Sequence, residues 1–431
     1  MKTYNNPTIE NWNTLKKRPE IDQKELGELV TSIIENVKSK GDQALIEYAL
    51  QFDKVILEDI VVSPEEIETA KALVPQKLKD AIQLAYDNIF KFHKSQQSTE
   101  VVIETVNGVK CWRKSVGIEK VGLYIPGGSA PLFSTILMLG IPAKIANCKE
   151  VVLCTPPSKD GTINPAILFT ANLVGITKIF KVGGAQAIAA MAVGTETIPQ
   201  VYKIFGPGNQ YVTKAKELVQ QRGVAIDMPA GPSEVLVIAD KTCNPAFVAA
   251  DLLSQAEHGP DSQVVLLSDS QETITQCQNE VELQVQLLPR KETALKALEN
   301  STAIVFNTIE KCIEFSNQYA PEHLIIASEN ASQYVNDITN AGSVFLGNYS
   351  CESAGDYASG TNHTLPTNGF AKNYSGVSLD SFVKKITFQE LNPQGIENIG
   401  EAIEIMAEAE GLFAHKNAVT LRLKEIKDGR N

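Results

Sequence analysis

Residues 121–154, VGLYIPGGSAPLFSTILMLGIPAKIANCKEVVLC, decide the fold class of this chain. In this stretch a short β-rich run is followed by a helical run and then by a second β-rich run. Because parallel strands are joined by long crossovers, usually helices, such alternation is typical of βα units. The pattern continues through NPAILFTANLV (164–174), TKIFKV (177–182), AQAIAAMAV (185–193), YKIFG (202–206) and VTKAKELVQQ (212–221).

The same rhythm resumes after Pro232, with helical runs between further β-rich runs. These β-rich runs are VLVIA (235–239), QVVLLS (263–268), AIVFN (303–307), LIIAS (324–328) and SVFLG (343–347). We therefore expect an α/β protein with two Rossmann-like parallel-sheet domains. The first domain is expected to be discontinuous, formed by residues 22–122 and 236–377, with residues 123–235 inserted as the second.

The two ends of the chain follow other patterns. Residues 1–21 lack a regular period and are interpreted as a small N-terminal arm. Residues 378–431 are expected to form a helical C-terminal segment, interrupted at Gly411 and too short for a core of its own. We expect this segment to pack on the body of the protein or on a second subunit.

Between the arm and residue 121, apolar spacing predicts helices in residues 23–52 and 64–95. His93 lies in the polar run KFHKSQQSTE and is interpreted as a solvated helix residue. Residues 101–112 resemble a β-hairpin that turns at Asn107-Gly108.

Charge and cysteine content narrow the functional class. The formal net charge of −12 at pH 7 disfavours nucleic acid and anionic membranes as partners, because neither attracts a negative protein. The seven cysteines form no CxxC pair and leave an odd one over, which indicates reduced thiols and a cytoplasmic location. Residues 1–22 lack the apolar core of a signal peptide, and the most apolar stretch, 130–148, is broken by prolines, a glycine and a lysine. A role with small molecules fits best.

Four of the five histidines, at positions 258, 323, 363 and 415, lie among carboxylates, amides and glycines. In DLLSQAEHG (251–259), Gln255 and His258 are three residues apart and would share one helical face. A histidine that caps a helix end is the alternative.

In Pro321-Glu322-His323, a carboxyl group is adjacent to an imidazole, and the two groups can share the proton transfers of a reaction. An exposed, solvated pair is the alternative.

Two further segments carry candidate ligands. Residues 350–363, SCESAGDYASGTNH, place Glu352, Asp356 and His363 among small residues, so that a loop could bring Asp356 close to a cation. A surface turn explains this segment equally well. Glu410 and His415 flank Gly411, where an ordinary amphipathic helix is the alternative.

Three glycine-bearing loops follow β-rich runs of the second predicted domain. Residues 206–211, GPGNQY, precede a helix, whose free N–H groups favour anions, but Tyr211 occupies the third glycine position of G-x-G-x-x-G. A simple strand-to-helix turn is the alternative. Residues 124–129, YIPGGS, and 183–186, GGAQ, follow two other runs, so the three loops could line one crevice.

The run IDMPAGPSE (226–234), continued by DLLSQAEH (251–258), closely resembles the signature of the histidinol dehydrogenase family. The similarity covers nearly the whole chain. It extends to VGLYIPGGSAPLFSTILMLG (121–140), FGPGNQYVTKAKE (205–217), APEHL (320–324), the loop from Asp356 to His363 and AEAEGLFAH (407–415).

The resemblance implies two successive NAD-dependent oxidations, from L-histidinol through L-histidinal to L-histidine, as the last reactions of histidine biosynthesis. Zinc is the implied metal, and its implied ligands are Gln255, His258, Asp356 and His415. Two imidazoles, a carboxylate and an amide suit this borderline ion. In the family, the substrate's imidazole and amino nitrogens complete the coordination, so the metal mainly positions the substrate.

The resemblance also implies the role of each further site residue. His323 would be the general base of both oxidations, and Glu322 would activate the water that attacks the aldehyde. The implied substrate contacts are Ser233, His363 and Glu410, in addition to His323 and the zinc ligands Gln255, His258, Asp356 and His415. The implied NAD contacts, in the inserted domain, are Tyr124, Gln186 and Asn209.

The family further implies a homodimer with intertwined subunits, in which the C-terminal segment reaches the partner's site. Two other classes of protein stay open as alternatives. A zinc hydrolase could use the same Glu-His pair to activate water against an amide and would need no nucleotide. A binding protein that has lost turnover is the second, although the intact Glu322-His323 pair argues against it.

Overall fold

The computed structural model describes residues 1–18, 23–127 and 131–429, and it contains the two expected parallel sheets. Residues 128 and 129 of the YIPGGS loop lie outside the described residues, as do residue 130 and the end of the expected N-terminal arm. The chain divides into two compact units. The first comprises residues 1–96 and 118–382, and the second comprises residues 97–117 and 383–431.

Among the described residues, six parallel strands form the first sheet, in the order β1-β11-β10-β9-β12-β13. Its strands are β1 (Lys2–Asn5), β9 (Glu234–Ala239), β10 (Gln263–Ser268), β11 (Thr302–Val305), β12 (His323–Ala327) and β13 (Ser343–Leu346). Its helices are α1 (Ile9–Leu15), α10 (Pro245–Ala256), α11 (Gln271–Gln284), α12 (Lys291–Glu299), α13 (Ile309–Tyr319) and α14 (Glu352–Tyr357). Along β9, Val235 and Val237 pack with the core under α10, whereas Leu236 and Ile238 pack with Trp12 and Phe315 on the opposite face. Both faces are therefore covered, as a parallel sheet requires.

The second sheet has the strand order β6-β5-β4-β7-β8 and is also parallel. Its strands are β4 (Lys120–Tyr124), β5 (Glu150–Cys154), β6 (Lys178–Phe180), β7 (Lys203–Phe205) and β8 (Ala225–Ile226). The helices that follow these strands are α6 (Phe133–Ile145), α7 (Pro165–Val174), α8 (Gly184–Val193) and α9 (Gln210–Gln220). The winding reverses between β4 and β7, which is the point at which such sheets bind ligands.

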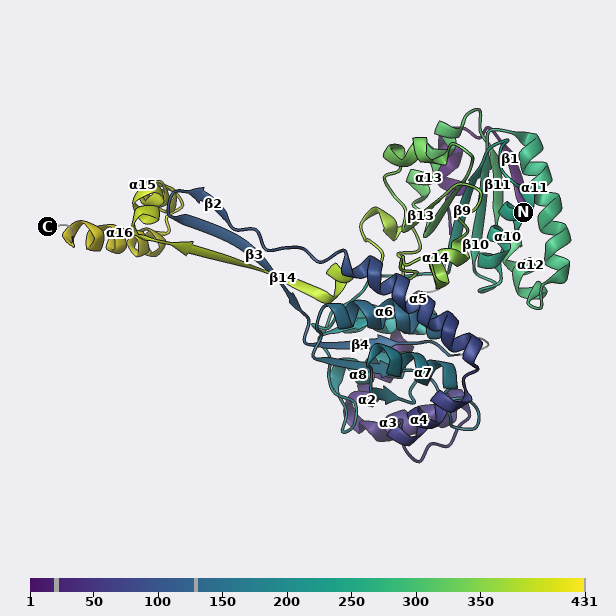
Figure 1. Ribbon diagram of the computed structural model, residues 1–431, viewed down its shortest axis with the longest axis horizontal. Helices are drawn as coiled ribbons and strands as arrows, with labels where there is room; N and C mark the ends of the chain where they lie inside the picture. Colours follow the sequence, from purple (N-terminus) through teal and green to yellow (C-terminus); the bar gives the residue numbers. More distant parts are fainter. Residues whose placement is uncertain (19–22, 128–130, 430–431) are drawn as a thin grey trace. The chain divides into compact units, whose positions relative to one another are not determined.

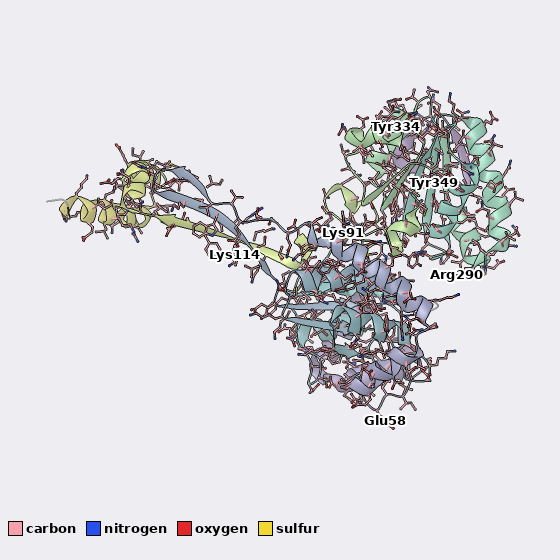
Figure 2. The ribbon with its side chains drawn as sticks, viewed as in Figure 1. Glu58, Lys91, Lys114, Arg290, Tyr334 and Tyr349 are labelled. Atoms are coloured by element: carbon pink, nitrogen blue, oxygen red, sulfur yellow. The ribbon has the colours of Figure 1, made fainter. Side chains whose placement is uncertain are left out.

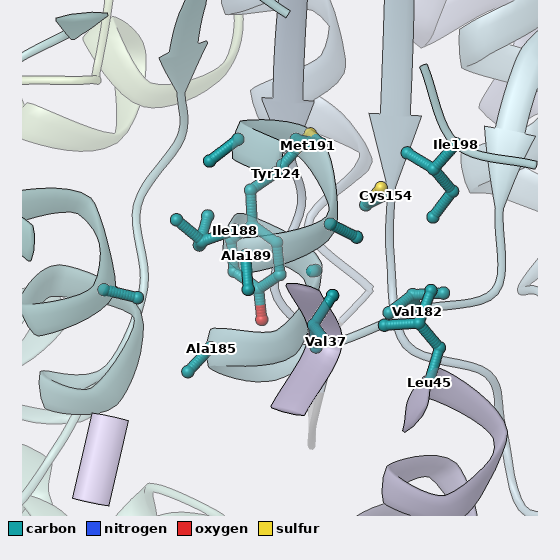
Figure 3. Packing of buried hydrophobic residues seen from close by; sticks show 14 of the residues in the cluster. Val37, Leu45, Tyr124, Cys154, Val182, Ala185, Ile188, Ala189, Met191 and Ile198 are labelled. Carbon is teal, nitrogen blue, oxygen red and sulfur yellow. The ribbon is translucent and has the colours of Figure 1, made fainter. Parts of the chain in front are cut away.

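The N-terminal helices pack on the second sheet, and this corrects an expected domain boundary. These helices are α2 (Gln23–Lys40), α3 (Asp42–Tyr48), α4 (Pro64–Leu73) and α5 (Gln76–Lys94). Helix α2 contacts α8 and α9, α4 contacts α7, and α5 contacts α6 (Figure 1). Val37 and Leu45 share one core with Tyr124, Cys154 and Ile188 (Figure 3). Residues 23–94 thus belong with the sheet of residues 120–226, although the sequence analysis grouped them with residues 236–377. Amphipathic spacing shows that a helix has a buried face but does not show which sheet covers it.

The described part of the expected N-terminal arm adds to the first sheet. Strand β1 pairs with β11 at the sheet edge, and Trp12 of α1 is buried against Phe306 and Phe315.

Charged side chains such as Glu58 and Lys91 are exposed on the surface of the first unit (Figure 2). Within the described residues, no helix has both the length and the apolar character needed to cross a membrane.

The second unit combines three antiparallel strands with two helices. Strands β2 (Ile103–Val106) and β3 (Val109–Gly117) form the predicted hairpin at Asn107-Gly108, and α15 (Pro393–Ala409) packs on α16 (Phe413–Asp428). Strand β14 (Val383–Leu391) was not expected, because the tail was interpreted as helical throughout. It pairs with β3 along its whole length, and Phe388 stacks on Trp112 at 5.4 Å between ring centroids. A pairing between segments so distant in sequence leaves no local signal.

Short turns complete the secondary structure. A π-helical turn spans Ala49–Asp53, and 3-10 turns span Val285–Leu287, Ala331–Asp337, Phe370–Lys372 and Leu379–Phe382.

His93 is buried, so its interpretation as a solvated residue was wrong. Its Nδ1 lies 2.9 Å from the Ile89 carbonyl, and its Nε2 lies 3.4 Å from the Asn362 amide nitrogen. Asn362 also donates to the Met138 carbonyl at 2.6 Å. A polar local sequence concealed this burial, because α5 presents His93 on its inner face beside Ile89, one turn earlier.

The buried His93 makes a prediction for stability against pH. Burial lowers the pKa of His93 below its ordinary value, so below about pH 6.5 the unfolded chain binds more protons than the folded chain. The free energy of unfolding should therefore fall on acidification, with a contribution from His93 of up to about 1.4 kcal/mol per pH unit. His93→Gln should remove this contribution when urea unfolding is compared between pH 7.5 and pH 5. Identical pH slopes for the variant and the parent would contradict the prediction.

Gly206 joins β7 to the turn before α9, where a side chain would not fit. Its φ is 130°, and a Cβ atom built there would lie 2.1 Å from the Tyr124 carbonyl oxygen. The GPGNQY segment leads from β7 into α9, and its first glycine allows the backbones after β4 and β7 to approach closely. Gly223 also has a positive φ, of 95°, but an added Cβ atom would meet nothing within 4 Å.

These two glycines form a matched pair for mutation. Gly223→Ala should cost only backbone strain, about 1–2 kcal/mol, because its surroundings are open. Gly206→Ala adds a backbone collision and should lower the free energy of unfolding by at least about 2 kcal/mol more. Chemical denaturation of both variants provides the measurement, and equal losses would show that the close approach at Gly206 is not rigid.

Candidate active site

Glu322 and His323 lie where the chain enters β12. Helix α13 ends at Tyr319, Ala320 adopts a left-handed conformation with φ 56°, and Pro321 follows, so the chain turns sharply into the strand. Both side chains are buried. The pair lies at the amino end of its strand, between α13 and β12.

The ring of His323 is held by the start of the neighbouring strand β9. Its Nδ1 lies 3.1 Å from the carbonyl oxygen of Glu234, which can only accept, so Nδ1 carries the proton and Nε2 is free. The Gln255 amide nitrogen lies 2.9 Å from the same Nδ1 and would suit the other tautomer. That tautomer would leave a buried Nε2–H with no hydrogen-bond acceptor among the described residues.

The electrostatic surroundings keep His323 neutral. Burial lowers its pKa to about 4, and the charge of Asp356, whose Oδ1 lies 3.8 Å from Nε2, opposes this shift. A neutral imidazole with a free, buried Nε2 is a competent proton acceptor near pH 7.

Glu322 is held by the same strand start. Its Oε2 accepts from the Glu234 backbone N–H at 2.8 Å and lies 3.7 Å from Nδ1 of His323. Burial raises the pKa of Glu322 well above its ordinary value, and the charges of Glu234 and Asp356 add to the shift. The Glu322 carboxylate is therefore a stronger base than an exposed glutamate side chain.

Gln255 and Glu352 form a buried pair with free oxygen atoms. The Gln255 amide nitrogen donates to Glu352 Oε1 at 3.0 Å and lies 3.5 Å from the Glu234 carbonyl, so two acceptors fix the orientation of the amide. Gln255 Oε1 and Glu352 Oε2 are buried and have no hydrogen-bond partner among the described residues. Ligand atoms of His323, Glu352 and Asp356 lie within 4.8 Å of one another. Buried oxygens without partners are costly, and a bound cation would satisfy them.

The structure brings part of the expected metal set together. Gln255, near the end of α10, and Asp356, in α14, both contact or approach His323. His258 follows α10 and is exposed; its backbone N–H donates to the Gln255 carbonyl at 3.2 Å. Arg290, labelled in Figure 2, donates to the His258 carbonyl at 3.4 Å. His415 and Glu410 are exposed residues of the second unit, so their place in the site stays a prediction.

Glu352 was noted in the sequence but received no role. It lies four residues before Asp356 in α14, so both carboxyl groups share one helical face. That spacing could have identified it. Burial raises its pKa well above the ordinary value, with Asp356 and Glu322 adding to the shift.

His363 and Ser233 lie at the margins of this cluster. His363 Nδ1 lies 2.9 Å from the Asp356 carbonyl, and Nε2 lies 3.1 Å from Thr135 Oγ1 in the first turn of α6. Ser233 immediately precedes β9 and is partly buried; its carbonyl accepts from the Gln263 backbone N–H at 3.1 Å.

A cavity of about 880 Å³ opens beside the carboxyl ends of the second sheet's strands, and the three expected NAD contacts, Tyr124, Gln186 and Asn209, line it. Tyr124 accepts from the Gly184 backbone N–H at 3.1 Å, and burial raises its pKa to about 12, so its hydroxyl retains a proton to donate. Asn209 caps α9 by accepting from Tyr211 and Val212 through Oδ1.

Asp53 and Thr155 also line this cavity, and neither was expected from the sequence. Asp53 Oδ2 and Thr155 Oγ1 are buried and have no hydrogen-bond partner among the described residues. Thr155 follows β5 directly, a position that strand counting could have identified. Asp53 comes from a π-helical turn far earlier in the chain, for which local sequence gives no signal.

Comparisons with known proteins identify the family of this chain. The family model described as histidinol dehydrogenase matches residues 16–423. The chain is 60% identical to the histidinol dehydrogenase of Bacteroides thetaiotaomicron over 427 residues, covering 99% of this chain and 100% of that relative. It is 53% identical to the Escherichia coli enzyme over 428 residues, covering 99% and 98%. The crystal structure of histidinol dehydrogenase from Elizabethkingia anophelis superposes with a TM-score of 0.97 at 62% identity, covering 99% of both chains. The chain therefore belongs to the histidinol dehydrogenase family of oxidoreductases.

Proposed function

We propose that this protein oxidises L-histidinol to L-histidine through L-histidinal, in two NAD-dependent steps that end histidine biosynthesis. Family membership supports the reaction. The observation that carries it is the buried, neutral His323, whose free Nε2 lies beside a cluster of carboxyl and amide oxygens. A base in this position can accept a proton from an alcohol held at the cluster.

Zinc fits the residues present, because free buried oxygens of Gln255 and Glu352 accompany Asp356 and an imidazole. Gln255, His258, Asp356 and His415 would hold the ion. Bound zinc would position the substrate through its imidazole and amino nitrogens. Ser233, His363 and Glu410 would contact the substrate around it.

His323 accepts the substrate hydroxyl proton at Nε2, and its Nδ1–H bond to the Glu234 carbonyl stabilises the resulting imidazolium. Bound NAD would supply the hydride acceptor in each oxidation. Glu322 takes a proton from the water that attacks the aldehyde, and its raised pKa favours retention of that proton. His323 then deprotonates the hydrate in the second oxidation.

For NAD, we propose the cavity beside the second sheet, with Tyr124, Gln186 and Asn209 as contacts. A cavity of about 880 Å³ is large enough for much of a dinucleotide. Because Tyr211 replaces the third glycine of the dinucleotide fingerprint, we expect a loose hold on the cofactor.

We also propose a cytoplasmic homodimer with intertwined subunits. The second unit supports this, because its exposed apolar side chains, among them Ile405, Met406 and Phe413, suit a subunit interface. Glu410 and His415 would then act in the partner's site.

The reaction predicts a stoichiometry. The zinc-loaded protein mixed with L-histidinol and NAD should form two NADH for each histidine, measured by absorbance and by amino-acid analysis. A zinc hydrolase would cleave amides without NAD and form no NADH from histidinol. A silent binding protein would bind histidinol in calorimetry without turnover. Either result would overturn the proposed function.

Two histidine variants separate the base from the metal site. His323→Asn should retain zinc and histidinol binding but lose turnover by about 100-fold or more, because a positioned general base contributes about 10²–10⁴-fold. His258→Asn should lose zinc, as measured by metal analysis. An unchanged rate in His323→Asn would exclude His323 as the base, and full zinc content in His258→Asn would exclude His258 as a ligand.

A further inference from the structure

We propose that Arg18, in the N-terminal arm, is a positioning residue for the catalytic pair and acts through Glu234. This proposal rests on the proposed function only in assigning Glu322 and His323 their roles. Arg18 lies far from both in sequence, and none of the catalytic motifs includes it.

Arg18 forms a bidentate ion pair with the buried carboxylate of Glu234. Nε donates to Glu234 Oε1, and Nη2 donates to Oε2 at 2.9 Å. The side chain of Arg18 is 13% exposed and that of Glu234 is 2% exposed. A bidentate pair restricts rotation as well as distance, which a single contact does not. The Asn368 backbone N–H donates to Glu234 Oε1 at 2.9 Å and restricts the carboxylate further.

The backbone of Glu234, rather than its side chain, forms hydrogen bonds with Glu322 and His323. Its N–H donates to Glu322 Oε2 at 2.8 Å, and its carbonyl accepts from Nδ1 of His323 at 3.1 Å. The second bond sets the tautomer that leaves Nε2 of His323 free. A rotation of Glu234 would therefore disturb the Glu322 carboxyl group and the His323 ring together.

Arg18 also contacts the end of α13, where the chain turns into β12. Nη2 donates to the Tyr319 carbonyl at 2.9 Å, and the guanidinium carbon lies 3.9 Å from the centre of the Tyr319 ring. Tyr319 is the last residue of α13, three residues before Glu322. Its hydroxyl donates to Gln263 Oε1 at 2.7 Å, which anchors the ring. One guanidinium thus fixes the starts of both β9 and β12.

Lysine cannot reproduce these contacts, because an ammonium is a point charge without a planar fork. Arg18→Lys keeps the charge beside Glu234 and is the informative variant. We expect kcat with histidinol and NAD to fall by about 10–100-fold, the range for displaced catalytic groups, with zinc content and the Kd for histidinol within about three-fold of the parent.

Lys16→Met is the matched control. Lys16 belongs to the same arm and donates to Gln318 Oε1 of α13 at 2.8 Å, without contacting Glu234. Its kcat should stay within about two-fold of the parent, since it docks the arm without touching the strand starts. Equal losses of kcat in Lys16→Met and Arg18→Lys would show that Arg18 only anchors the N-terminal arm, and this result would overturn the proposal.

Guanidinium ion tests the positioning role directly. Added at millimolar concentration to Arg18→Ala, it should raise kcat several-fold, while Lys16→Met should show no response. If Arg18→Ala does not fold, the double variant Arg18→Met/Glu234→Gln, which leaves no lone buried charge, takes its place and should show the loss of kcat without rescue. A folded double variant with parental kcat would overturn the proposal.

One measurement does not need turnover. The ¹⁵N chemical shifts of the His323 ring should show Nδ1–H and a free Nε2 in the parent, and a mixture of tautomers in Arg18→Lys. Unchanged shifts in a folded Arg18→Lys would overturn the proposal, whether or not the protein oxidises histidinol. Absence of NADH in the parent would overturn the proposed function alone.

Discussion

The backbone of Glu234 is the constraint on which the site depends. Its N–H donates to the carboxyl group of Glu322 and its carbonyl accepts from the ring of His323, so one residue orients both side chains at once. Backbone groups at the start of a paired strand cannot move without breaking the ladder, and β9 lies between β10 and β12 in the sheet. The positions of Glu322 and His323 are therefore fixed by β9, a strand in the interior of the sheet.

The cost of this arrangement is a concentration of buried carboxyl groups. Glu234, Glu322 and Glu352 are all buried, and burial raises the pKa of each. Of these, Glu234 has a cationic partner, Arg18, whereas Glu352 retains a free oxygen within the part of the chain that the structure describes. Such a site lowers the stability of the free protein and favours a cation that satisfies the oxygens, so binding and stability are linked.

The parts predictable from sequence were those with a local signal. Alternating runs in residues 121–221 and again in residues 235–347 predicted the two parallel sheets, and Asn107-Gly108 predicted its hairpin. The burial of His93 and the pairing of β14 with β3 depend on partners about 270 residues away, so neither leaves a local pattern. In the site, motifs identified Gln255, Asp356 and His323, which the structure brings together. Arg18 and Asp53, whose contacts are tertiary, were missed, whereas Glu352 received no role although its spacing from Asp356 is a local signal.

The two sheets place their candidate site residues at opposite ends of their strands. The second sheet offers the carboxyl ends of its strands, where Tyr124 and Asn209 line the cavity, whereas the first offers the amino ends of β9 and β12. His363 connects them, because its Nδ1–H donates to the Asp356 carbonyl and its Nε2 accepts from Thr135 in α6. With both ring nitrogens engaged, a ligand can bond to His363 only by replacing Thr135 or the Asp356 carbonyl. A ligand that displaced Thr135 from His363 would therefore change a contact of α6, the first helix after β4, whose residue Tyr124 lines the cavity of the second sheet.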